Sequence, residues 1–153
     1  RKICILAGLA FGKHIPYTAI PHLEGITSVT DRDIKEAKEQ GYTIKLLGSA
    51  ELLENQVRIL VAPHLVPAGN LLSAVSAVFN AVSVTGEAVG ETVFYGRGAG
   101  SLPTASAVAC DILEALSKKP LPTLRPFAEE DFVLQEIGGN TVTLPSGKTF
   151  FTL

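Results

Sequence analysis

The chain has 153 residues, of which 46% are hydrophobic and 18% charged, and its formal net charge is −2. This is the length of one domain that can bury a core, and the apolar content excludes a disordered chain. No cluster of Lys and Arg provides the positive surface that nucleic-acid phosphates require, so we expect no nucleic-acid partner.

Residues 3–11 are predicted to form the first helix. One helical face is apolar through Ile3, Leu6, Ala7 and Ala10. Ile5 and Leu9 extend the apolar surface almost all round, so we expect a buried helix that ends at Gly12. No Ser, Thr, Asp or Asn precedes the helix as a start signal, which indicates a piece of a longer protein.

A loop and a capped helix are expected next. Residues 13–25 contain two prolines and two histidines and predict a loop. Thr30 and Asp33 have the spacing of a capping box, in which each side chain accepts from the other's backbone amide. The helix should run to about Gln40 and end at Gly41.

Two hairpins are predicted in the middle of the chain. Alternating apolar residues indicate strands over 42–48 and 57–61, joined around residues 54–56. After a loop at residues 63–70, a second hairpin should pair residues 75–84 with residues 88–95 through a turn at 85–87. The stretch 59–86 lacks charged residues, but its unbroken part is too short for a membrane helix, so buried strands are the better interpretation.

The last predicted elements are a helix and a strand-like tail. The helix should begin at Pro103 and end near Lys118 and Lys119. Its apolar residues recur at helical spacing: Ala105, Val108, Ala109, Ile112, Leu113 and Leu116. Short strands are expected within 131–137 and 141–153. Together the elements predict an α+β fold, with a mixed, mainly antiparallel sheet covered by helices.

The glycine-rich run at residues 96–100 is the strongest local signal for a ligand. Glycines let a ligand approach backbone amides, and a following helix start favours anions. The G-x-G-x-G spacing differs from the dinucleotide fingerprint, so a plain flexible connection is an equal alternative. Arg97 is the only charge in the run, and it serves either to bind an anion or to keep the loop soluble.

One lysine and the three histidines are further candidates for chemistry. Lys2 would suit a general acid beside a carbonyl substrate, but composition alone favours a solvated lysine. The three histidines, His14, His22 and His64, share no metal-ligand spacing, so no metal site is expected.

The remaining polar and thiol candidates are expected to be structural. Cys4 and Cys110 lie in apolar helical patterns, which predicts reduced thiols in a cytoplasmic protein. Cys110 has no activating cation nearby and is expected to pack rather than react. Asn80 lies in an apolar strand, where it would satisfy a backbone group or a dimer contact.

Four segments, at residues 23–30, 41–48, 78–100 and 101–112, resemble homoserine dehydrogenase, and the opening RKICILAGLAFG resembles the helix that follows that family's signature. The resemblance covers residues 1–117 and implies the substrate-binding and dimerisation part of a two-domain dehydrogenase. It includes no counterpart of the N-terminal nucleotide-binding domain. Residues 118–153 would then be a C-terminal extension of uncertain fold.

The resemblance also implies chemistry. The family interconverts L-homoserine and L-aspartate 4-semialdehyde with NAD(P) in threonine, methionine and isoleucine biosynthesis. Its signature ends in an aspartate, three further residues and a lysine, and that lysine falls on Lys2, the implied proton donor to the alkoxide. Gly98, Ala99 and Gly100 would lie near the nicotinamide end of a cofactor held mainly by the domain that the resemblance does not include.

The same resemblance implies a homodimer and a chain that is inactive alone. The helix from Pro103 would pack against the nucleotide-binding domain through Val108 and Ile112. Two alternatives remain at this point: a non-catalytic self-association module that uses the uncharged strands, and an anion-binding module that uses the glycine run.

Overall fold

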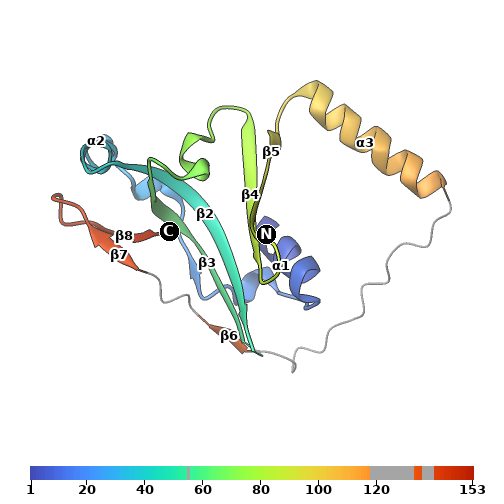
Figure 1. Cartoon of the computed structure of the whole chain (residues 1–153), viewed down its shortest axis with the longest axis horizontal. Coiled ribbons are helices and arrows are strands. Elements are labelled where there is room, and N and C mark those ends of the chain that lie inside the picture. The colour runs from blue at the N-terminus through green and yellow to red at the C-terminus, as the bar shows by residue number, and fades with distance from the viewer. Residues whose placement is uncertain (55, 118–132, 136–139) are drawn as a thin grey trace. The chain divides into compact units, whose positions relative to one another are not determined.

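The computed structural model describes residues 1–54, 56–117, 133–135 and 140–153 (Figure 1). It divides into two compact units, residues 1–68 with 124–153, and residues 69–123. The elements are α1 (Lys2–Phe11), β1 (His22–Leu23), α2 (Asp31–Glu39), β2 (Tyr42–Leu53), β3 (Gln56–Pro67), β4 (Phe79–Gly86), β5 (Gly90–Arg97), α3 (Ser101–Leu116), β6 (Val133–Gln135), β7 (Thr141–Thr143) and β8 (Thr149–Thr152). Single turns of 3-10 helix lie at Tyr17–Ala19, Ile26–Ser28 and Leu71–Ala74.

The first unit is built on β3. This strand pairs antiparallel with β2 over their whole length, from Tyr42 opposite Pro67 to Leu53 opposite Gln56. On its other edge β3 pairs in parallel with β6, β1 and β8, and β7 pairs antiparallel with β8 (Figure 1). The predicted α+β fold with a mixed, mainly antiparallel sheet is therefore confirmed.

The loop predicted at residues 63–70 is wrong in its first half, because β3 continues through Pro67. The Ala68 amide donates to the Gly41 carbonyl at 2.9 Å. In this ladder the backbone N–H groups of the even-numbered residues of β3 therefore point towards β2. Pro63 and Pro67 are odd-numbered, so their missing N–H groups would have pointed away from β2. Prolines at these positions remove nothing from the long ladder.

Two clusters form the core of the first unit. In the first cluster, Cys4 and Ala7 of α1 pack with Ile15, Val57 and Ile59. In the second cluster, Ala37 of α2 packs with Leu65, Leu144 and Phe150. Residues of the β7–β8 hairpin therefore complete this cluster.

The structure corrects the expectation that the first helix is buried all round. Within α1 only Cys4 and Ala7 are buried, whereas Ile5 and Leu9 are 64% and 59% exposed. The helix lies on the β2–β3 hairpin with one face. It ends as predicted at Gly12, whose φ of 66° is left-handed.

The predicted capping box at the start of α2 is confirmed. The Thr30 hydroxyl accepts from the Asp33 amide at 3.2 Å, and Asp33 Oδ2 accepts from the Thr30 amide at 2.9 Å. Asp33 is buried and also accepts from the Ser146 hydroxyl and the Lys148 ammonium, at 3.1 and 3.3 Å. The same carboxylate therefore caps a helix and holds the β7–β8 turn.

The second unit contains the β4–β5 hairpin and α3. The hairpin is confirmed, but its turn lies at residues 87–89, between Gly86 and Gly90, rather than at 85–87. Gly90, with φ of 69°, takes the left-handed conformation that ends this turn.

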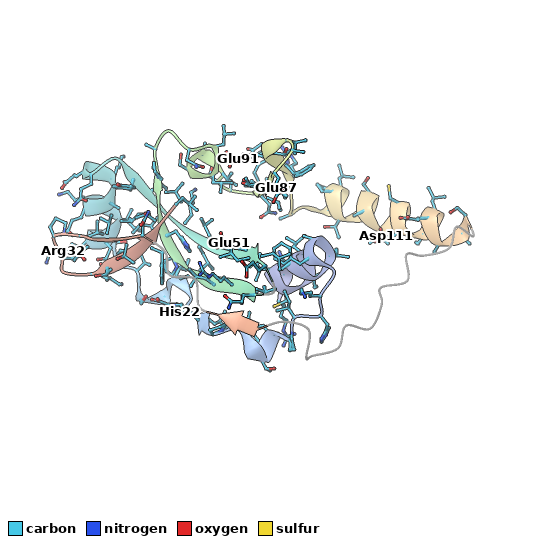
Figure 2. All side chains as sticks on the ribbon, turned by 60° about the horizontal axis from the view of Figure 1, so that its bottom comes forward. His22, Arg32, Glu51, Glu87, Glu91 and Asp111 are labelled. Carbon is cyan, nitrogen blue, oxygen red and sulfur yellow. The ribbon has the colours of Figure 1, made fainter. Side chains whose placement is uncertain are left out.

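The third helix begins at Ser101, two residues before the predicted start. Pro103 then falls in the first turn, where an amide N–H has no partner within the helix. All residues of α3 are described and none is buried (Figure 2, where Asp111 is labelled). Val108 and Ile112, expected to pack against another domain, are 52% and 55% exposed.

Candidate functional site

The glycine run continues the end of the β4–β5 hairpin. Arg97 is the last residue of β5 and pairs with Phe79. The Gly98 amide then donates to the Val78 carbonyl at 3.0 Å, which extends the ladder by one step. Gly100 precedes α3 with φ of 119°, a conformation that favours glycine, and its carbonyl accepts from the Thr104 hydroxyl at 2.8 Å. The run is therefore an ordered turn between a strand and a helix.

Asn80 covers this turn. A Cβ atom placed on Gly98 would overlap Asn80 Nδ2 and would lie 2.5 Å from Asn80 Cγ. Residue 80 pairs with Gly96, so Gly98 is its diagonal neighbour on the same face of the hairpin. In the part of the chain that the structure describes, we find no hydrogen bond from the Asn80 amide. Of its two expected roles, the bond to a backbone group is therefore not observed, and the dimer contact stays a prediction.

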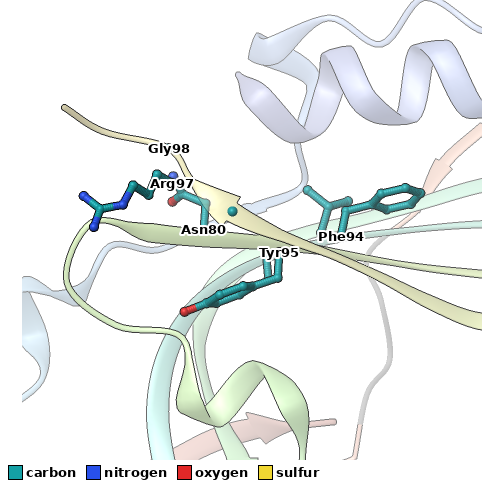
Figure 3. Close-up of a pocket in the computed structure, with 8 residues that line it drawn as sticks. Asn80, Phe94, Tyr95, Arg97 and Gly98 are labelled. Atoms are coloured by element: carbon teal, nitrogen blue, oxygen red, sulfur yellow. The ribbon is translucent and has the colours of Figure 1, made fainter. Parts of the chain in front are cut away.

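An open pocket of about 340 Å³ lies beside this contact (Figure 3). The residues around it include Asn80, Val82, Phe94, Tyr95, Arg97 and Gly98. The pocket thus has apolar walls, and the exposed amide of Asn80 and the backbone of the glycine turn lie at its edge.

Arg97 belongs to an aromatic stack on the hairpin. Its guanidinium carbon lies 5.5 Å from the centre of the Phe79 ring, and Phe79 stacks on Tyr95 with ring centres 4.9 Å apart. A cation over an aromatic face is attracted by the ring quadrupole. This contact orients the Arg97 guanidinium, a structural role that the sequence did not predict.

Lys2 is the first residue of α1 and is exposed. Lys2 lies in the first unit, and Gly98, Ala99 and Gly100 lie in the second.

The other candidate residues occupy separate places. His64 is buried in β3, where its Nδ1 donates to the Ala62 carbonyl at 2.8 Å, and burial lowers the pKa of the ring. His22 lies at the edge of the Phe151 ring, and its Nε2 is 3.6 Å from Glu24 (His22 is labelled in Figure 2). His14 is exposed. Over the described residues, no three His, Cys, Asp or Glu side chains are grouped to hold a metal.

The two cysteines are both free thiols. Cys4 is buried, as expected. Cys110 is exposed, so the prediction that it packs is not met, because α3 exposes the face that carries it.

Comparison with known proteins shows which family this is. The sequence profile of the family described as homoserine dehydrogenase matches residues 1–113. The chain belongs to the homoserine dehydrogenase family. Homoserine dehydrogenase from Neisseria gonorrhoeae is 49% identical over 114 residues, which are 74% of this chain and 26% of that protein. The Bacillus subtilis enzyme is 45% identical over 121 residues, 79% of this chain and 28% of that protein.

Solved structures of homoserine dehydrogenases agree with the fold. The structure from Thiobacillus denitrificans has a TM-score of 0.75 and 36% identity, and covers 92% of this chain and 34% of that chain. A structure from S. aureus at pH 6.5 has a TM-score of 0.70 and 39% identity, and covers 85% of this chain and 32% of that chain. The chain thus spans about a third or less of the homoserine dehydrogenases that it matches.

The family assignment made from the sequence is therefore confirmed, and the matched range contains both Lys2 and the glycine turn. Sequence reasoning missed the contact between Asn80 and Gly98. With the turn placed at residues 85–87, Asn80 would have paired with Thr92 instead of Gly96, far from the glycine run. Among the described helices, none combines the length and apolar character that crossing a bilayer requires.

Proposed function

We propose that this chain is the substrate-binding and dimerisation part of an NAD(P)-dependent homoserine dehydrogenase. It would interconvert L-homoserine and L-aspartate 4-semialdehyde, a step of threonine, methionine and isoleucine biosynthesis. The observation that carries the proposal is the family match over residues 1–113. This range includes Lys2, on which the resemblance places the lysine that ends the family signature. Residues 118–153 follow as an extension, of which β7 and β8 join the sheet of the first unit.

Lys2 has the role of proton donor in this proposal. When bound, the nicotinamide supplies or accepts the hydride at the carbonyl carbon. The Lys2 side chain is exposed, and its ammonium group would stabilise negative charge on the substrate oxygen. It gives that oxygen a proton during reduction and takes the proton back during oxidation.

In this proposal the glycine turn would lie at the nicotinamide end of the cofactor. Gly98 and Gly100 present exposed backbone without side chains, and the first turn of α3 carries no acidic residue. Gly98, Ala99 and Gly100 would therefore hold one end of NAD(P), while a separate nucleotide-binding domain would hold most of it. We place the protein in the cytoplasm, where free thiols such as Cys4 and Cys110 stay reduced.

A chimera tests the proposed activity. In the Neisseria gonorrhoeae homoserine dehydrogenase, the matching segment is replaced by residues 1–113 of this chain. We expect NADPH-dependent reduction of L-aspartate 4-semialdehyde by the chimera, measured as loss of absorbance at the NADPH band. The isolated chain of 153 residues should show no turnover, because most cofactor contacts lie elsewhere.

The parent enzyme in the same assay is the control for the chimera. A folded chimera that binds NADPH but does not reduce the aldehyde would contradict the proposed function. Turnover by the isolated chain would contradict its assignment as the substrate-binding part alone.

We also propose that the partner of the β4–β5 hairpin is a second copy of this chain. Val82, Val84 and Phe94 share one face of the hairpin and are 38%, 47% and 62% exposed. A two-stranded sheet with an open apolar face is marginal on its own. Sedimentation should therefore give a dimer for the chain and a monomer for Phe94→Ser, with Val89→Ser in the hairpin turn as the control.

The same measurement separates the alternative self-association module from the enzyme. Dimerisation together with an inactive chimera would favour the non-catalytic module. A monomer at all concentrations would remove both the module and the proposed dimer.

A further inference from the structure

We infer that Asn80 is a positioning residue, whose side chain holds the glycine turn by packing over Gly98. The inference rests on the proposed function, because the turn is where the nicotinamide end of the cofactor is proposed to lie. It adds a residue on β4 that acts on the cofactor through the turn rather than by touching the reacting atoms.

The contact between the two residues is one of shape. The Asn80 amide fills the place that a Cβ on residue 98 would take, since such a Cβ would overlap Nδ2 and lie 2.5 Å from Cγ and 3.2 Å from Cβ of Asn80. The φ angle of Gly98 is not in the left-handed region, whereas that of Gly100 is. A side chain at residue 98 would therefore displace the exposed Asn80 amide, whereas the backbone conformation of residue 98 does not itself favour glycine.

The backbone of the turn has one direct tie to the hairpin near this point. The Gly98 amide donates to the Val78 carbonyl at 3.0 Å, next to the last strand pair, Phe79 with Arg97. The Asn80 side chain, lying over Gly98, would hold the Gly98 backbone amide close to the Val78 carbonyl. Without such cover, the exposed glycine backbone would gain freedom at the point where the chain leaves the strand.

The chemical consequence concerns orientation. Hydride transfer depends steeply on the placement of the nicotinamide, and a displacement of about 1 Å can lower the rate by about 100-fold. The adenosine half of the cofactor would be bound by the other domain. Loosening of the glycine turn should therefore lower kcat more than it raises KM for the cofactor.

Four variants separate packing from hydrogen bonding. Asn80→Ala removes the cover, and Gly98→Ala places a Cβ where the amide lies. The double variant Asn80→Ala with Gly98→Ala puts a methyl group into the vacated space and should restore the turn. Asn80→Leu keeps the branched shape of the side chain without its polar atoms, so it should resemble the wild type.

The first readout uses the full chain of 153 residues and needs no activity. Hydrogen exchange of the residue 98 amide, followed by NMR, reports its bond to the Val78 carbonyl. We expect exchange to be about tenfold faster in each alanine single variant. Exchange should return close to the wild-type rate in the double variant and in Asn80→Leu. Faster exchange in Asn80→Leu, or no recovery in the double variant, would overturn the inference.

The second readout is kinetic and uses the chimera. Asn80→Ala should lower kcat by about 10- to 100-fold with little change in KM for NADPH, and should raise the isotope effect for deuterated NADPH. The double variant should recover most of kcat. An active chimera whose kcat does not change in Asn80→Ala would overturn this inference and leave the proposed function standing. A wild-type chimera without activity would overturn the proposed function, and the exchange data would then still decide whether Asn80 holds the turn.

Discussion

Replacing Lys2 by methionine in the chimera is expected to lower kcat for aldehyde reduction by about 10²- to 10⁴-fold. Methionine has similar length but carries no proton to give and no charge to place beside the developing alkoxide. The cofactor contacts are unaffected, so KM for NADPH should change little. Steady-state kinetics with L-aspartate 4-semialdehyde and NADPH measure both quantities.

Two further variants make the test of Lys2 specific. Lys2→Arg keeps a positive charge, but a guanidinium is a very weak acid, so most of the loss should remain. Lys35→Met removes an exposed lysine from α2 and should leave kcat unchanged. A Lys2→Met chimera that retains more than about a tenth of wild-type kcat would refute the role of Lys2 as proton donor.

Asp33→Ala should lower the free energy of unfolding of the chain by about 2–4 kcal/mol. The buried carboxylate accepts hydrogen bonds from Thr30, Ser146 and Lys148, so its loss uncaps α2 and also releases the β7–β8 turn. The Ser146 hydroxyl would lose its acceptor, and Ser146 would keep only the bond from its amide to Glu36, at 2.7 Å. Urea denaturation of the full chain gives the difference.

Asp31→Ala is the matched control for this prediction. Asp31 is acidic and lies in the same first helical turn, but it is exposed, so its loss should cost less than about 1 kcal/mol. Equal losses for Asp31→Ala and Asp33→Ala would show that only the charge near the helix end matters and that the tail is not held by Asp33.

The same carboxylate predicts how stability depends on pH. Hydrogen bonds from Thr30, Lys148 and Ser146 outweigh burial and lower the pKa of Asp33 from 3.8 to about 2. A carboxyl whose pKa is lower in the folded state stabilises the fold above its unfolded pKa. This contribution should be lost as pH falls from about 4 towards 2, and it should be absent in Asp33→Asn, measured by urea denaturation across that pH range.

The sequence by itself determined the features that depend on neighbours along the chain. The capping box at Thr30 and Asp33, the end of α1 at Gly12, and the existence of both hairpins follow from side-chain chemistry and backbone preference over a few residues. The family was also recognised from continuous segments, because residues 78–112 form one unbroken resemblance that the family profile covers.

Only the tertiary structure decided the features that join distant residues. The β3 strand passes through Pro63 and Pro67 because their missing N–H groups point away from β2, which the register reveals and local preference does not. Asp33 meets Ser146, and Asn80 meets Gly98, because strand pairing brings those positions together. A shift of two residues in a hairpin turn changes which residues of the two strands lie opposite each other. A sequence pattern that predicts a strand therefore does not predict which residues on the neighbouring strand it contacts.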